Sequence, residues 1–440
     1  MRFCKALILV ASLLSAVSLG FSQGLSGAEI QSILQKERNP PLGGQFSFKG
    51  HQVLTFDIRN QAELEELTKV IKKYSLDEWT RPHIGPVDVR VQPEFITAVR
   101  SSVRSPVKVK IPDLGEAILL SNRQADAQLR KSVTTPGLPN LDFSKSYHNY
   151  EELAQFVTKL NNDYKNITEV VSVGKSYEGR DMIGLRIRGK NPKKVFIFNG
   201  AQHAREWLTP AVTAYIMDAF TGLYGKDETI TQLVDHYDIY AIPVMNPDGY
   251  KFTQSNRMWR KNRQPNPSSR CIGTNTDRNW DAAFGGPGSS NDPCDEAYHG
   301  PSAFSSPESK NMAEFIKSKK AYVYIDFHAY GQRWMWSYGD SCSKKPPNEE
   351  KLKKGAELAV NALAATHGSR FETGPNCSPY EISGSAVDWA TEKGQVPFAY
   401  AVELRDQGRY GFVLPANQII PSGEETLAGV SALLRYVMDN

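Results

Sequence analysis

Beyond residue 140, short and almost purely apolar segments alternate with stretches of helical spacing. Such segments are typical of strands buried on both faces, which need helices above and below them. We therefore predict an α/β domain with a mixed central sheet flanked by helices. The predicted strands are 195–199, 239–244, 322–325 and 398–402, and the predicted helices are 211–223 (after an N-cap at Thr209), 306–318, 349–366, 385–392 and 424–437.

A smaller unit is predicted over residues 46–111. Its strands would be 53–58, 87–91 and 107–111, and its helices 64–74 and 95–99. The order β-α-β-α-β favours a small α+β open sandwich with both helices on one face.

An exposed helix is then expected from Leu114 to Lys131. It ends in the basic pair Arg130-Lys131, and the segment 133–137, with Pro136 and Gly137, cannot continue it. A dibasic pair at such a boundary is typical of a proteolytic processing site. The alternative is an ordinary solvated basic pair.

The first residues have the features of a secretory signal peptide over 1–23. A basic start precedes the apolar run 6–19, and small and polar residues follow it. A membrane anchor is the alternative, but the run is short and lacks a basic flank after it. We expect a secreted, extracellular protein without a membrane partner.

Four cysteines remain once Cys4 is removed with the signal peptide. An even count in a secreted chain predicts two disulfides, with three pairings open. Their loop positions favour Cys271 with Cys294 and Cys342 with Cys377. Asn166-Ile167-Thr168 is a glycosylation sequon in a polar segment, so Asn166 is the expected glycan site.

Composition excludes several classes of protein. The 40% apolar and 23% charged residues are ordinary for a folded globular chain and exclude wholesale disorder. The 52 Lys and Arg against 48 Asp and Glu leave a net charge of +4, without a long basic run. We therefore expect no nucleic-acid partner, and we expect a monomer.

Three residues at predicted strand ends have the chemistry of zinc ligands. His203 and Glu206 follow strand 195–199, and His328 follows the strand ending at 325. An H-x-x-E pair alone arises easily by chance, and a loop His with a helix-start Glu would explain it. With His328, however, the set has the two histidines and one carboxylate of an open catalytic zinc site.

Glu403 also ends a predicted buried strand. A carboxylate there is costly unless it is paired, hydrogen-bonded or in use. Beside a zinc-bound water it would act as a general base, and an ion pair with a nearby Arg is the alternative.

These residues lie within a longer ordered series of motifs. The chain resembles secreted zinc metallocarboxypeptidases of the pancreatic A/B type, which are made as pro-enzymes. The resemblance covers about 143–440 and extends into the N-terminal unit. The matching motifs are His203-Ala-Arg-Glu206-Trp, Asn246-Pro-Asp-Gly-Tyr250, Asn256-Arg-Met-Trp-Arg-Lys261, Asp277-Arg-Asn-Trp280, Tyr298-His-Gly300, His328-Ala-Tyr330 and the run Glu403 to Phe412.

The resemblance implies an activation propeptide over 24–131 and a zinc carboxypeptidase domain over 132–440. It implies one Zn²⁺ per chain, peptide or protein C-termini as substrates and an activating trypsin-like protease. The implied zinc ligands are His203, Glu206 and His328, the two-His-one-Glu set for which carboxypeptidases are a known example. It also implies cis peptide bonds at Ala329–Tyr330, Ser337–Tyr338 and Arg405–Asp406.

The remaining roles are also implied by the resemblance. Glu403 and Arg260 are the catalytic residues, with Arg260 stabilising the oxyanion. Arg278 would bind the substrate carboxylate, and Tyr380 would close over it. The further substrate-binding positions are Arg205, Asp277, Tyr330, Val387, Ala401 and Phe412.

The chain departs from the family pattern at two positions. The usual Asp-x-Asn-Arg-Asn-Trp is here Asn275-Thr276-Asp277-Arg278-Asn279-Trp280, with Asp and Asn exchanged. Asn275 can still accept a hydrogen bond from the first zinc histidine. An ionised Asp277 would repel a substrate carboxylate unless it were paired with Arg278 or Arg260 or took a proton.

The resemblance implies that Val387 lies at the base of the side-chain pocket, where an acid would select Lys or Arg, so we expect bulky aliphatic or aromatic C-terminal residues. Ile382, Met335, Gly339 and the small Ala401 would complete an apolar pocket. Two alternatives remain: a zinc amidase or deacylase acting on a non-peptide substrate, and an inactive peptide-binding relative. The second would be expected to lack a ligand or the base, and this chain keeps them all.

Overall fold

The computed structural model describes residues 25–38, 44–123, 138–378 and 380–440. The chain divides into two compact units, 1–39 and 40–440. The described part of the first is helix α1 (Gly27–Arg38). The predicted signal peptide and the Arg130-Lys131 pair lie outside the described residues. The signal peptide and the domain boundary after residue 131 therefore stay predictions.

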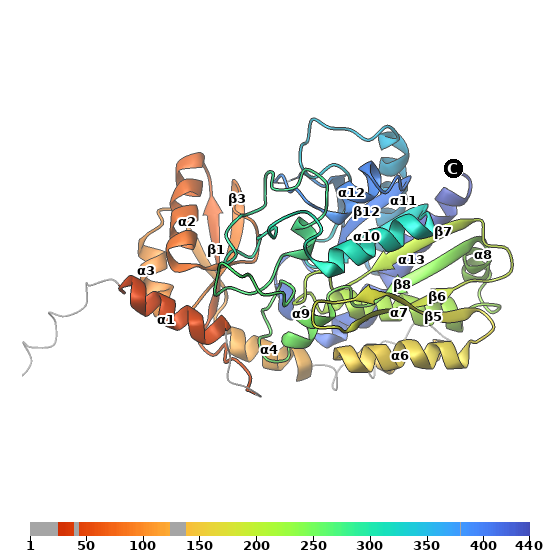
Figure 1. Cartoon of the computed structure of the whole chain (residues 1–440), viewed down its shortest axis with the longest axis horizontal. Helices are drawn as coiled ribbons and strands as arrows, with labels where there is room; N and C mark the ends of the chain where they lie inside the picture. The colour runs from red at the N-terminus through yellow and green to blue at the C-terminus, as the bar shows by residue number, and fades with distance from the viewer. Residues whose placement is uncertain (1–24, 39–43, 124–137, 379) are drawn as a thin grey trace, which may run out of the picture. The chain divides into compact units, whose positions relative to one another are not determined.

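The second unit contains an eight-stranded mixed sheet, as predicted (Figure 1). Its strand order is β11-β10-β12-β9-β7-β8-β6-β5, in which β12, β9, β7 and β8 are parallel neighbours. Antiparallel pairs add β6 and β5 at one end and β10 at the other. The strands are β5 (Thr168–Lys175), β6 (Asp181–Ile187), β7 (Lys194–Asn199), β8 (Tyr237–Ile242), β9 (Val323–His328), β10 (Arg333–Trp336), β11 (Glu372–Pro375) and β12 (Phe398–Glu403).

Both faces of this sheet are covered because alternate side chains of the central strands enter two different cores. In β7, Phe196 and Phe198 pack in one core and Ile197 packs in the other. The first core also holds residues of α6, α7, α8, α11 and α13, and the second holds residues of α10 and α12. The helices are α6 (Tyr150–Asp163), α7 (Leu208–Gly222), α8 (Glu228–His236), α9 (Pro247–Phe252), α10 (Pro307–Lys319), α11 (Glu349–His367), α12 (Ala386–Glu392) and α13 (Ile419–Met438), with short 3-10 turns η2 (Phe143–Lys145), η3 (Thr276–Arg278), η4 (Gly411–Val413) and η5 (Ala416–Gln418).

The start of α7 differs from the prediction. Thr209 lies inside the first turn, and the helix begins at Leu208 after Trp207. The Thr209 hydroxyl instead donates to the Glu206 carbonyl and accepts from the Ala201 N–H, at 2.9 and 2.7 Å. Thr209 therefore fixes the loop that carries Glu206, which is a tertiary role that local capping rules do not reveal.

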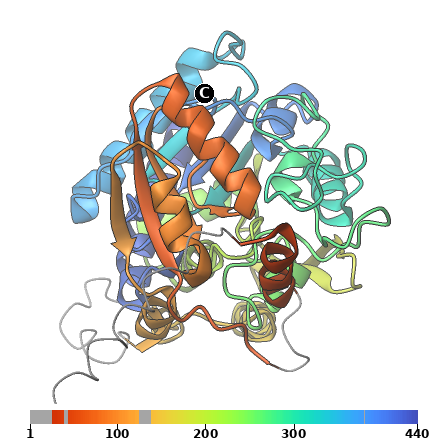
Figure 2. The ribbon, with the colours of Figure 1, turned by 90° about the vertical axis from the view of Figure 1, so that its left-hand side faces the viewer.

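The second compact unit also contains the small α+β fold predicted over residues 46–111, which we call the N-terminal α+β unit. Its four-stranded sheet has the order β2-β3-β1-β4. Helices α2 and α3 lie on one face of it, as expected (Figure 2). The exposed helix predicted over 114–131 is described only to Arg123, and its first residue, Leu114, is fully buried in a core with Phe48 and Phe412. The elements are β1 (Gln52–Ile58), α2 (Gln61–Tyr74), β2 (Asp77–Glu78), β3 (Gly85–Val91), η1 (Pro93–Phe95), α3 (Ile96–Ser101), β4 (Val107–Ile111) and α4 (Leu114–Arg123).

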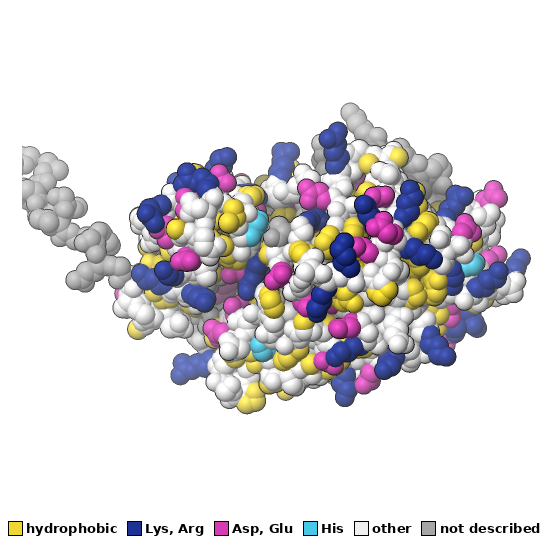
Figure 3. All heavy atoms as spheres, turned by 90° about the horizontal axis from the view of Figure 1, so that it is seen from above, with side chains coloured by type: hydrophobic (Ala, Val, Ile, Leu, Met, Phe, Trp, Pro, Cys, Tyr) yellow, Lys and Arg dark blue, Asp and Glu magenta, His cyan; other side chains and the backbone are white. Residues whose placement is uncertain are grey.

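No helix among the described residues is long and apolar enough to cross a membrane. On the face seen in Figure 3, Lys and Arg side chains are interspersed with Asp and Glu. This mixing agrees with the small net charge of +4.

Candidate active site

His203, Glu206 and His328 come together at the ends of two neighbouring parallel strands. His203 and Glu206 lie in the loop between β7 and α7, and His328 is the last residue of β9. Their facing atoms are 2.8 Å (His203 Nδ1 to Glu206 Oε1), 3.1 Å (His203 Nδ1 to His328 Nδ1) and 3.2 Å (Glu206 Oε2 to His328 Nδ1) apart. Ligands 2.0–2.1 Å from a tetrahedral zinc ion lie about 3.3 Å from one another, so the donor set fits zinc.

The electrostatics of this cluster favour a bound cation. Burial, with help from Arg260, lowers the pKa of His203 to about 4, so its ring is in the neutral form that binds metals. Burial opposes ionisation of Glu206, but the two histidines hold the pKa of its carboxyl below the usual range. Against the effect of burial, Asp326 and Glu206 raise the pKa of His328 well above its ordinary value. The carboxylates thus attract positive charge, which a metal ion supplies.

The outer nitrogens of both histidines also have partners. His203 Nε2 lies 3.1 Å from Asn275 Oδ1, the contact that the sequence predicted. His328 Nε2 lies 2.9 Å from Asp326 Oδ2, a contact that it did not predict. Both rings therefore direct Nδ1 toward the metal position.

Glu403 ends β12 and pairs in register with His328 on the neighbouring strand β9. Burial raises the pKa of its carboxyl to about 8, with Glu206 adding to the effect and His328 opposing it. Its Oε2 has no hydrogen-bond partner among the described residues. A half-buried carboxyl group with one unsatisfied oxygen beside a metal position is suited to accept a proton from a water molecule there.

Two arginines extend the positive side of the site. Arg260 Nη1 lies 3.4 Å from Glu206 Oε1. Arg278 is anchored by its own neighbour, because its Nη1 donates to Asp277 Oδ2 at 2.9 Å and its Nε donates to the Gly288 carbonyl. Asp277 Oδ1 accepts from the Ala386 N–H at 3.0 Å. Of the two partners proposed for Asp277, the structure therefore selects Arg278.

These groups share one cavity of about 620 Å³. Arg205 and Gly339 are outside its lining. The residues of the predicted site that line it are His203, Glu206, Arg260, Asp277, Arg278, His328, Tyr330, Met335, Tyr380, Ile382, Val387, Ala401, Glu403 and Phe412.

The protein-family model for zinc carboxypeptidases matches residues 153–429 of this chain. The chain belongs to the zinc carboxypeptidase family. It is 38% identical over 404 residues to "Metallocarboxypeptidase A" of Trichophyton rubrum, which covers 89% of this chain and 94% of that protein. It is 37% identical over 410 residues to "Carboxypeptidase A4" of Mus musculus, covering 90% and 96% of the two chains. The enzyme is thus a metallocarboxypeptidase that uses zinc and acts on peptides.

Solved structures agree with this assignment. The crystal structure of thrombin activatable fibrinolysis inhibitor is 28% identical, with a TM-score of 0.81 over 89% of this chain and 100% of that chain. The carboxypeptidase A of Helicoverpa armigera is 26% identical, with a TM-score of 0.78 over 89% and 98%. The three cis peptide bonds that the resemblance implies are present in our structure. They are at Ala329–Tyr330, Ser337–Tyr338 and Arg405–Asp406.

The N-terminal α+β unit contributes to the same cavity. Glu78, Trp79, Thr80, Arg81 and Asp88 are among its lining residues. The Trp79 ring packs edge-on against Phe412, with 5.0 Å between ring centroids. The Tyr330 hydroxyl donates to Asp88 at 3.2 Å. In this structure the unit therefore occupies part of the cleft of the carboxypeptidase.

Arg205 makes the central contact with the N-terminal unit. Its Nη1 donates to Asp77 Oδ1 at 2.6 Å and its Nη2 donates to the Glu78 carbonyl at 3.1 Å. Asp77 also accepts from Arg90 at 2.9 Å. Burial opposes its ionisation, but Arg205 and Arg90 lower the pKa of Asp77 to about 2. Arg205, predicted to bind substrate, is thus occupied by a carboxylate of the chain itself.

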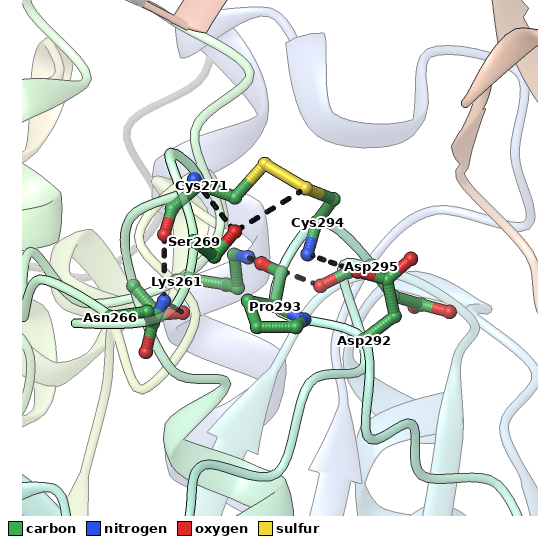
Figure 4. Close-up of a disulfide and its surroundings, with 9 residues drawn as sticks. Lys261, Asn266, Ser269, Cys271, Asp292, Pro293, Cys294 and Asp295 are labelled. Atoms are coloured by element: carbon green, nitrogen blue, oxygen red, sulfur yellow. Dashed lines mark hydrogen bonds between the residues drawn. A yellow bond between two sulfur atoms is a disulfide. The ribbon is translucent and has the colours of Figure 1, made fainter.

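Both disulfides form with the favoured pairing, Cys271–Cys294 and Cys342–Cys377, with Cα atoms 5.1 and 5.5 Å apart. The first spans the loop that carries Asn275, Asp277 and Arg278. Figure 4 shows Lys261 beside it, donating to the carbonyls of Pro293 and Asp295. The second holds the chain three residues before Tyr380. Both therefore restrain loops that form the cleft.

Sequence reasoning missed several charged residues of the cavity, among them Glu296, Asp326 and Arg333. Arg333 donates to the Ser378 carbonyl next to the Tyr380 loop. Asp326 carried one signal, an acid two residues before a ligand histidine in an otherwise apolar strand, which places both side chains on one face.

Proposed function

We propose that the enzyme is a secreted pro-carboxypeptidase that removes single bulky aliphatic or aromatic residues from peptide C-termini. The observation that carries this proposal is a cavity that joins a charged anchor, Arg278, to an apolar pocket beside the zinc ligands. A panel of blocked dipeptides with different C-terminal residues, together with amidated controls, tests it. Hydrolysis of amidated and free peptides at equal rates would favour an amidase instead.

Each polar group has a role in this proposal. Zinc, when bound, polarises the scissile carbonyl and makes a water molecule acidic. Glu403 accepts the proton of the attacking water and passes it to the leaving amine. Arg260 donates to the developing oxyanion, and Arg278 holds the terminal carboxylate. Tyr380 closes over that carboxylate as a lid.

The apolar pocket supports the proposed preference. Val387, Ala401, Met335 and Ile382 line the cavity, and each is at most 8% exposed. A charged C-terminal side chain would lose its hydration there without a partner of opposite charge from any of these four residues. A bulky apolar side chain gains by the same burial.

Val387→Asp should move the preference toward C-terminal Lys and Arg. We expect kcat/KM for a C-terminal Phe substrate to fall roughly 100-fold, about 3 kcal/mol, because the pocket would hold an unpaired charge. Steady-state kinetics on Phe, Leu, Lys and Arg substrates measure this. Val387→Ile is the matched control and should keep the Phe preference. An unchanged profile in Val387→Asp would remove residue 387 from the pocket.

The contacts of the N-terminal α+β unit support a pro-enzyme. They place Asp77 on Arg205 and Trp79 on Phe412, where the upstream part of a peptide would lie. Secretion is supported by the apolar run 6–19 and by the two disulfides. Asn166 is exposed, as a glycan site requires.

Cleavage at Arg130-Lys131 by a trypsin-like protease should release activity. The uncut protein should hydrolyse long peptides slowly because the N-terminal α+β unit occupies part of the cleft. Rates measured before and after trypsin, with cleavage mapped by mass spectrometry, test this. An Arg130→Ala/Lys131→Ala variant should stay intact and slow. Equal rates for cut and uncut enzyme would disprove latency.

A further inference from the structure

The two zinc histidines of this enzyme differ in what holds their outer nitrogens. His203 Nε2 meets the neutral amide oxygen of Asn275, whereas His328 Nε2 meets the carboxylate of Asp326 at 2.9 Å. Both rings are buried and both direct Nδ1 into the cluster. Of the two zinc histidines, it is therefore His328 whose outer nitrogen is hydrogen-bonded to a carboxylate.

Asp326 is held firmly by groups of the sheet. It lies in β9 opposite Asn199 of β7, and both side chains are fully buried. Asn199 Nδ2 donates to Asp326 Oδ1 at 2.7 Å, and the Tyr324 hydroxyl donates to Asn199 Oδ1 at 2.8 Å. Tyr324, Asp326 and His328 alternate along one strand and so share one face. The hydrogen-bonded series Tyr324–Asn199–Asp326–His328 thus rests on strands and not on loops.

The surroundings make this carboxylate costly unless a cation is near. Asp326, Asp277 and His328 have ligand atoms within 4.8 Å of one another, so two buried carboxylates are neighbours. Arg278 offsets the charge of Asp277 through a 2.9 Å contact. Asp326 itself lies against His328 Nε2 at 2.9 Å and accepts from Asn199 Nδ2 at 2.7 Å, so its charge is stabilised by hydrogen bonds and by the metal that His328 would hold.

We propose that Asp326 is the positioning residue of the zinc site: its carboxylate fixes the proton on His328 Nε2 and presents Nδ1 to the metal. A carboxylate hydrogen-bonded to a ligand histidine sets its tautomer, limits its rotation and raises its basicity. Asn275 orients His203 in the same way but without charge. The metal affinity of this enzyme therefore depends on Asp326 more than on Asn275.

The test is the zinc dissociation constant of the full-length Asp326→Asn variant, measured by competition with a chelator of known affinity. We expect zinc to bind about 10–100-fold more weakly than in the unchanged protein. The cobalt-substituted variant should also show a changed visible absorption spectrum, because His328 becomes a weaker and less fixed ligand. Zinc affinity within twofold of the unchanged protein would overturn the proposal.

Asp248→Asn is the matched control. Asp248 is 1% exposed and accepts hydrogen bonds from Ser176 and Glu178, so it is another buried carboxylate, but it has no contact with either histidine. It should keep the zinc affinity and the cobalt spectrum. Equal losses in both variants would mean that Asp326 has only a general structural role.

Tyr324→Phe covers the case in which Asp326→Asn does not fold. It keeps the ring and the carboxylate but removes the hydroxyl that fixes Asn199. We expect zinc affinity to fall by a smaller factor than in Asp326→Asn and the cobalt spectrum to shift in the same direction. No change in either measurement would overturn the proposal.

Discussion

Glu403→Gln should lower kcat by about 1,000-fold and leave the zinc content at one ion per chain. General-base catalysis contributes roughly 10²–10⁴-fold, and a glutamine of the same shape cannot accept the proton. Glu403 is half-buried and pairs in register with His328, but it is not one of the three clustered ligands, so metal binding should survive its loss. Steady-state kinetics on a blocked C-terminal Phe dipeptide, with metal analysis of the same sample, measure both effects.

Glu372→Gln is the matched control for this carboxyl-to-amide change. Glu372 also lines the cavity, but its side chain is 76% exposed and lies 3.6 Å from Arg333. It should retain nearly full activity. If Glu403→Gln kept more than a tenth of kcat, another group would have to be the base.

The central strands could be predicted from the sequence because strands that are buried on both faces of a sheet consist of continuous apolar runs. In β7, Phe196 and Phe198 pack in the core on one face and Ile197 packs in the core on the other, so all three residues are apolar. The outer strands have no such continuous apolar run. β5 at the sheet edge includes Glu169 and Lys175 and is mostly half-buried or exposed, so no apolar run distinguishes it from a loop.

The candidate site was predicted largely through ordered motifs, and the rest depends on contacts between distant strands. His203, Glu206 and His328 stand at strand ends that periodicity could locate. The partnership of Asp326 with Asn199 becomes visible only when β7 and β9 are paired in register. Likewise the occupation of Arg205 by Asp77 joins residues 128 positions apart.

The exchange of Asp and Asn puts a carboxylate, that of Asp277, directly before Arg278. Arg278→Ala should lower kcat/KM for a free C-terminal Phe substrate by about 3 kcal/mol, roughly 100-fold, since the carboxylate loses its charged donor. The same change also leaves Asp277 without the 2.9 Å partner that neutralises it. On the amidated substrate, which lacks the carboxylate, the penalty should be much smaller.

Asp277→Asn should instead keep or improve kcat/KM. The asparagine oxygen can still accept from the Ala386 N–H, as Asp277 Oδ1 does at 3.0 Å. Arg278 then loses its ion pair with this side chain but keeps the hydrogen bond to the carbonyl of residue 277, and a repulsive charge near the substrate carboxylate disappears. Specificity constants of both variants between about pH 5 and pH 8, a range in which a free carboxylate is ionised, decide the matter. If Asp277→Asn abolished activity while Arg278→Ala were mild, Arg278 would not be the carboxylate anchor, and an amide substrate without a free carboxylate would fit this cleft better.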